Sequence, residues 1–207
     1  MHTIKDKVLV GITGGIGSGK TEVCRVLEKE GFKVLYADQM AKDLYTTDKK
    51  LNEKIVKMLG KKVLNFKNKI SLSKLKKEIF SNEKIYKKFT HLVHPVVIEA
   101  LKKEIKSMKG EKIVLIETAL AFESGMDKDL DYVIMVYSNK KNRMARIRLR
   151  DESTYKEIET IMHFQMDEKE KIEKSDFVIV NNKTQKDLDA QTIFIGKVLK
   201  ALKKRKK

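Results

Sequence analysis

A glycine-rich segment near the start of the chain limits the possible folds more than any other feature. It runs from residue 8 to residue 21 as Val-Leu-Val-Gly-Ile-Thr-Gly-Gly-Ile-Gly-Ser-Gly-Lys-Thr. The apolar, β-branched residues 8–12 predict a buried strand, and apolar side chains at helical spacing follow the loop. Residues 14–21 fit the pattern G-x-x-x-x-G-K-[ST] in the strand–loop–helix context that a phosphate-binding loop requires.

The residue types in this loop are those that bind a nucleoside triphosphate. Glycines adopt backbone conformations closed to other residues, so successive N–H groups can point at phosphate oxygens. Lys20 can reach the β- and γ-phosphates, and the hydroxyl of Thr21 can ligate Mg²⁺. A flexible turn is the alternative, but it would need neither the lysine nor the threonine. The expected binding residues are Gly14, Gly15, Gly17, Ser18, Gly19, Lys20 and Thr21.

Four further apolar runs predict strands. They cover residues 32–35, 112–116, 132–137 and 177–180, and helical patterns separate them. Strands that are apolar throughout and alternate with helices favour a parallel sheet covered on both faces. The expected fold is therefore a three-layer α/β P-loop fold with a parallel sheet of about five strands.

Two helical tracts interrupt this alternation. Residues 46–110 show helical patterns and no clear strand, which predicts a small helical domain on the substrate side. Within it, Pro95 predicts a helix boundary at His94-Pro95, because proline breaks a helix from inside. Residues 143–173 predict a helical lid, with one helix over 139–150 and another over 154–173. The core domain is then expected over residues 1–45, 111–142 and 174–207.

The net charge of +17 suggests an anionic partner, but its distribution does not favour nucleic acid. The excess is mostly lysine spread over the chain, whereas four of the six arginines lie within residues 143–150. The basic residues 203–207 are expected to be a frayed helix end. No apolar run approaches the ~20 residues of a membrane span, and residues 1–7 lack the apolar core of a signal peptide. With a single cysteine, Cys24, a cytoplasmic location is the simplest expectation.

Further short motifs follow the P-loop in order along nearly the whole chain. They are Tyr36-Ala37-Asp38 with Ala41-Lys42, His94-Pro95, residues 117–123 (Glu-Thr-Ala-Leu-Ala-Phe-Glu), Arg146…Arg150-Asp151…Gln165, and residues 175–182 (Ser-Asp-Phe-Val-Ile-Val-Asn-Asn). The ordered set resembles the dephospho-coenzyme A kinase family. The resemblance implies transfer of the γ-phosphoryl group of ATP to the ribose 3′-hydroxyl of dephospho-coenzyme A. The chain departs from the usual family residues at Tyr36, Lys42, Glu117, Ala119 and Lys183.

A carboxylate and an arginine pair are the expected catalytic groups besides Lys20. Asp38 follows a strand on the side where ligands bind in open α/β sheets. Its position alone fits a helix N-cap or an acceptor-orienting base equally, and the resemblance favours the base. Arg146 and Arg150 lie four residues apart on one helix face, as in a phosphate clamp; a solvated basic face is the alternative.

Three other residues are expected at the edge of the site. His94 and Glu117 are expected on the acceptor side, although His94 fits a structural role equally well. Asn181 is expected near the adenine, with a turn residue as the alternative. The four histidines and the cysteine lack zinc-ligand spacing.

Two other functions compete with the expected one. A nucleoside or nucleoside-monophosphate kinase would share the P-loop, the helical acceptor domain and the arginine lid. A non-enzymatic GTP-dependent switch is more distant, because residues 182–185 read Asn-Lys-Thr-Gln rather than Asn-Lys-x-Asp. The sequence does not indicate the oligomeric state.

Overall fold

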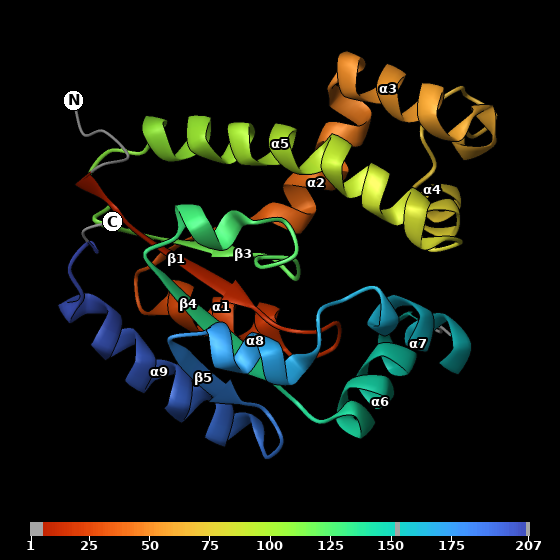
Figure 1. The fold of residues 1–207 in the computed structure, drawn as a ribbon. Helices are drawn as coiled ribbons and strands as arrows, with labels where there is room; N and C mark the ends of the chain where they lie inside the picture. Colours follow the sequence, from red (N-terminus) through yellow and green to blue (C-terminus); the bar gives the residue numbers. More distant parts are fainter. Residues whose placement is uncertain (1–5, 152–153, 206–207) are drawn as a thin grey trace. The chain divides into compact units, whose positions relative to one another are not determined.

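A five-stranded parallel sheet forms the centre of the fold (Figure 1). The computed structural model describes residues 6–151 and 154–205. The strand order is β2-β3-β1-β4-β5, and every neighbouring pair is parallel. The strands are β1 (Val8–Thr13), β2 (Lys33–Tyr36), β3 (Ile113–Glu117), β4 (Tyr132–Tyr137) and β5 (Phe177–Val180). The predicted parallel sheet is confirmed, with each strand within one residue of its expected bounds.

The chain divides into two compact units. The core unit holds the described residues up to Tyr36 and from Glu104 onward, and the helical unit is Ala37–Lys103. The core unit contains the sheet, the short 3₁₀ helix η3 (Met126–Asp129), and α1 (Lys20–Lys29), α6 (Lys140–Asp151), α7 (Tyr155–His163), α8 (Glu168–Lys174) and α9 (Gln185–Ala201). The helical unit contains α2 (Ala37–Thr47), α3 (Lys49–Leu59), η2 (Lys61–Val63), α4 (Leu72–Ile79) and most of α5 (Glu83–Ser107).

Successive residues of β1 face opposite sides of the sheet, and a different layer of the core unit covers each side. Val8, Val10 and Ile12 face a cluster that includes buried residues of α1 and α9. Gly11 points the other way, where a Cβ atom would overlap the side chain of Leu130, just after η3. The absence of a side chain at Gly11 therefore leaves room for the side chain of Leu130 against the strand. With α8 packed against β4, the sheet lies between two layers, which confirms the three-layer α/β fold.

The predicted helix boundary at His94-Pro95 is wrong. Helix α5 continues through Pro95 as one 25-residue helix. Proline inside a helix costs about 3 kcal/mol, but Pro95 lies on the exposed side, where water can reach the carbonyl it leaves without a partner. The opposite side carries buried residues at every fourth position, and burying each one contributes roughly 1.5–3 kcal/mol, enough to keep the helix continuous. These residues are Phe89, Val93, Val97 and Leu101.

The predicted single helix over residues 154–173 is also wrong. Helix α7 ends at His163 and α8 begins at Glu168. The intervening turn directs polar groups to other segments: the backbone N–H of Met166 donates to Glu123 at 2.9 Å. Asp167 then caps α8 by accepting from the backbone N–H of Lys169. These contacts replace the helical hydrogen bonds of the turn. The expected linker residues 152–153 lie outside the described residues.

The basic C-terminal segment is not a frayed helix end in its described part. Helix α9 ends at Ala201, and the next residues are tied to the sheet. The carbonyl of Lys203 accepts from the Tyr132 hydroxyl at 2.9 Å, and Lys204 donates to the carbonyl of Lys7 at 2.9 Å. Arg205 pairs with Asp176 at 2.6 Å. Along the described part of the chain, no helix is both long and apolar enough to cross a membrane.

Candidate active site

The glycine-rich loop joins β1 to α1 at the carboxyl edge of the sheet. Lys20, the first residue of α1, is only 8% exposed, and its ammonium donates to the carbonyl of Gly14 at 3.1 Å. The same nitrogen lies 3.9 Å from Oε1 of Glu117, which ends β3 and is also buried. The loop thus holds its lysine beside a carboxylate, in the position expected for phosphate binding.

The tightest part of the loop requires glycine. Gly19 has a φ of 101°, and a Cβ atom there would overlap the amide nitrogen of Asn181. That amide donates to the carbonyl of Ser18 at 2.8 Å. Asn181 therefore lies directly against the loop, so its side chain holds the loop from the end of β5. The sequence predicted that Asn181 lies near the adenine or serves as a turn residue, and it did not predict this hydrogen bond to the loop.

Arg146 on α6 joins the same network. Its guanidinium donates at 3.1 Å to the side-chain oxygen and to the carbonyl of Asn181. It also donates to the hydroxyl of Ser138 at 3.1 Å and makes longer contacts, at 3.4 Å, with the carbonyls of Gly17 and Ser18. Arg150, one turn later, is instead exposed and pairs with its neighbour Asp151 at 2.6 Å. The two expected arginines therefore occupy different surroundings.

Two residues hold Ile16, in the middle of the loop, from both sides. The carbonyl of Ile16 accepts from Nε of Arg143 at 2.9 Å, and its N–H donates to Oε1 of Gln165 at 2.9 Å. Arg143 is 4% exposed and also pairs with Glu168. Sequence reasoning did not select Arg143 or Gln165 as site residues. The arginine-rich stretch and the motif that ends in Gln165 were the available signals.

A buried ion pair lies behind this contact. Lys171 on α8 is fully buried, pairs with Glu123 at 2.7 Å and donates to the carbonyl of Ala119 at 2.8 Å. Burial lowers the pKa of the Lys171 ammonium, and the carboxylate of Glu123 opposes that shift. In the sequence Lys171 lies in a run of charged residues that looks like a solvated helix, so only the fold reveals its burial.

The donors and hydroxyls of the loop fit a triphosphate with Mg²⁺. The hydroxyls of Ser18 and Thr13 are buried and have no hydrogen-bond partner among the described residues. Thr21 is exposed in the first turn of α1, where the helix dipole favours anions. Mg²⁺ in nucleotide sites takes few protein oxygens besides phosphate and water, so the Thr21 hydroxyl is a suitable ligand.

Two expected residues belong to the helical unit. Asp38 is the second residue of α2, which begins at Ala37 directly after β2, so Asp38 is inside the first turn and is not the N-cap. This position argues against the helix-cap alternative. His94 is half-buried in the middle of α5, so it does not cap a following helix.

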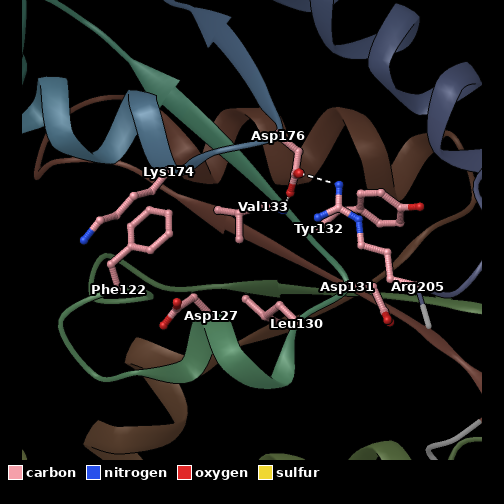
Figure 2. A pocket seen from close by; sticks show the side chains of 9 residues that line it. All are labelled: Phe122, Asp127, Leu130, Asp131, Tyr132, Val133, Lys174, Asp176 and Arg205. Carbon is pink, nitrogen blue, oxygen red and sulfur yellow. Dashed lines mark hydrogen bonds and ion pairs between the residues drawn. The ribbon is translucent and has the colours of Figure 1, made fainter. Parts of the chain in front are cut away.

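A cavity at the opposite, amino edge of the sheet is also rich in charged groups (Figure 2). Its lining includes Asp131, Asp176 and Arg205, and Arg205 lies over the ring of Tyr132 at 4.3 Å. The two aspartates accept hydrogen bonds from strand N–H groups, and Arg205 pairs with Asp176. These side chains are engaged with the protein itself, so the cavity does not compete with the glycine-rich loop as a nucleotide site.

The parallel sheet, the loop with its buried lysine and the arginines of α6 define a P-loop protein of the kinase type. The family model for dephospho-CoA kinase matches residues 8–187. The chain is 38% identical over 181 residues to a dephospho-CoA kinase of Fusobacterium nucleatum subsp. nucleatum, covering 87% of this chain and 93% of that protein. This chain therefore belongs to the dephospho-CoA kinase family.

Solved structures agree with this assignment. A protein from Thermus thermophilus has a TM-score of 0.78 at 26% identity, covering 95% of this chain and 98% of that one. The dephospho-CoA kinase of Campylobacter jejuni has a TM-score of 0.65 at 25% identity, covering 92% of this chain and 96% of that one. The likeness extends over both units of the chain.

Proposed function

We propose that this protein transfers the γ-phosphoryl group of ATP to the ribose 3′-hydroxyl of dephospho-coenzyme A. The observation that carries the proposal is the buried Lys20 within the glycine-rich loop of a chain that matches the dephospho-CoA kinase family over most of its length. The bond from the γ-phosphorus to the β–γ bridging oxygen breaks, a bond to the ribose oxygen forms, and ADP leaves.

The loop supplies the ATP site in this proposal. Its backbone N–H groups and Lys20 neutralise the phosphate charge. The hydroxyl of Thr21 would hold Mg²⁺, which would supply Lewis-acid stabilisation of the phosphate oxygens. Asn181 acts from behind, because its hydrogen bond to Ser18 fixes the loop. In this proposal Asn181 also lies near the adenine of ATP, as the sequence predicted.

The acceptor side rests on Asp38, His94 and Glu117. Asp38 accepts a hydrogen bond from the ribose hydroxyl, holds it in line with the γ-phosphorus and takes its proton. Glu117 lies beside Lys20 and orients the lysine and the nearby acceptor. His94 contacts a phosphate of the acceptor. Residues 46–110 form the acceptor domain in this proposal, and residues 1–45, 111–142 and 174–207 form the core.

Residues 143–173 act as the lid, with Arg146 and Arg150 as its phosphate-facing groups. Charge that develops during transfer is stabilised most by donors already in place. Arg146 is already beside the loop, whereas Arg150 must exchange Asp151 for phosphate.

The free, buried Cys24 suits the reducing cytoplasm, which we propose as the location.

An assay of ADP release tests the function directly. We expect ATP consumption to require dephospho-coenzyme A, and the product to carry phosphate on the ribose 3′ oxygen. Nucleoside monophosphates offered at the same concentration should release no ADP above background. Turnover of a nucleoside monophosphate without turnover of dephospho-coenzyme A would overturn the proposal in favour of the rival kinase.

A further inference from the structure

We infer that Gln165 is a positioning residue that sets the shape of the phosphate-binding loop through the backbone N–H of Ile16. The two groups lie 2.9 Å apart although 149 positions separate them in the chain. Ile16 occupies the part of the loop between β1 and α1, so neither element supplies a backbone acceptor for its N–H. The side chain of Gln165 supplies that acceptor.

The backbone of Ile16 is held at both of its polar groups. Its carbonyl accepts from the buried Arg143, whose guanidinium also pairs with Glu168 at the start of α8. Arg143 lies on α6, and Gln165 lies in the turn between α7 and α8. Together they fix the orientation of the peptide groups on both sides of Ile16, and therefore the direction in which the following loop N–H groups point.

The turn that carries Gln165 is itself anchored. The next residue, Met166, donates its N–H to Oε1 of Glu123, and Lys171 pairs with the same oxygen. Lys171 is fully buried and also donates to the carbonyl of Ala119. The buried ion pair and these extra hydrogen bonds hold the turn in place. The amide of Gln165 therefore already lies where it can accept the N–H of Ile16.

The chemistry of the contact explains why an uncharged acceptor suits this place. A carboxylate could also accept the N–H of Ile16, but it would add a negative charge next to a loop that binds phosphates. The glutamine amide accepts the hydrogen bond without that charge. The effect on turnover rests on the proposed function, whereas the effect on the loop N–H does not.

Hydrogen exchange at Ile16 is the direct test. We expect Gln165→Met, which keeps the length of the side chain but has no amide, to speed exchange of the Ile16 amide by about tenfold or more in the protein without nucleotide. Gln185→Met is the matched control, because Gln185 is an exposed glutamine on α9 whose amide donates to Asp189 on the same helix. Unchanged exchange at Ile16 in a folded Gln165→Met protein would overturn the inference whatever the substrate proves to be.

Kinetics separate positioning from a merely structural role. Losing one hydrogen bond to the loop should raise KM for ATP about three- to tenfold and leave kcat within about twofold. A purely structural role would lower kcat through the folded fraction and leave KM unchanged, and that pattern would count against positioning.

Gln165→Glu keeps the acceptor, so the Ile16 amide should stay protected from exchange while KM for ATP rises. If Gln165→Met does not fold, Gln165→Glu provides the test. Fast exchange of the Ile16 amide in that variant would contradict the inference.

Discussion

The two edges of the parallel sheet use similar polar side chains for different purposes. At the amino edge, Asp131 precedes β4 and accepts the N–H of Leu9 in β1 at 2.8 Å. Asp176 precedes β5 and accepts the N–H of Val133 in β4 at 2.8 Å. Each aspartate also donates its own N–H to the carbonyl of the same partner residue. The same pair of hydrogen bonds occurs on two adjacent strands and satisfies the N–H and C=O groups of the second residue of β1 and of β4.

At the carboxyl edge the protein leaves polar groups available. The loop after β1 turns through glycines, and the hydroxyls of Thr13 and Ser18 are buried without a partner among the described residues. The ammonium of Lys20 donates to the carbonyl of Gly14 and lies 3.9 Å from the carboxylate of Glu117. The comparison shows that a charged cavity such as that in Figure 2 does not by itself mark a ligand site. Groups that the fold leaves unpaired are the better sign.

The largest expected effect is at the carboxyl edge. Lys20→Ala should abolish turnover and weaken ATP binding, because the β- and γ-phosphates lose their nearest cation. Lys174→Ala is the control from the amino edge, since that lysine lines the other cavity and pairs with Glu170. In steady-state assays the control variant should turn over at nearly the wild-type rate. A tenth of wild-type turnover in Lys20→Ala would contradict the role given to the loop.

Asp38→Asn tests the acceptor side. The substitution keeps the size of the side chain and removes its basicity, so turnover at saturating acceptor should fall by about 10² or more. ATP binding and thermal stability should be unchanged. Asp43→Asn, on the same helix and exposed, is the control. If Asp38→Asn leaves turnover unchanged, Glu117 becomes the next carboxylate to test.

The two arginines of the proposed lid should affect turnover more than ATP affinity. Arg146→Ala and Arg150→Ala are each expected to lower kcat by about tenfold or more, because the guanidinium acts on charge that develops in transfer. Arg148→Ala, which removes an exposed arginine stacked on Tyr155, is the control on the same helix. A large rise in the ATP dissociation constant with normal kcat would show a simple binding role.

Asp131→Ala should give the opposite result, a loss of stability without a loss of catalysis. The N–H of Leu9 is buried and would lose its acceptor, which costs about 1–3 kcal/mol. For a chain of this size that corresponds to a fall in Tm of about 2–4 °C for each kcal/mol. Asp129→Ala, an exposed neighbour, should change Tm much less. Lower turnover per folded molecule in Asp131→Ala would break the distinction between the two edges.

The smallest effect is expected from Arg205→Ala. Its pair with Asp176 is half-exposed, and such pairs contribute about 0–1 kcal/mol. The stacking on Tyr132 adds a similar amount. Thermal unfolding should therefore shift by only a few degrees, with turnover unchanged. A shift as large as that of Asp131→Ala would mean that the C-terminal segment holds the amino edge more firmly than its exposure indicates.

Local sequence patterns were enough to predict the sheet and the glycine-rich loop. Apolar runs are local signals, and five of them gave five strands to within one residue. The spacing from Gly14 to Thr21 is a local signal too, because the proposed phosphate site uses the backbone of a few adjacent residues. The ordered motifs indicated the family for a similar reason, because each is confined to one short stretch of the chain.

The contacts that distant side chains make with that loop follow from the three-dimensional fold and not from local patterns. Nothing local to Gln165 or Arg143 predicts that both hold Ile16, and Lys171 looks like a surface residue until the fold buries it against Glu123. Likewise Pro95 predicts a helix end until the buried side of α5 is known to outweigh its cost. Burial and pairing depend on contacts between segments far apart in the chain, and local patterns do not carry that information.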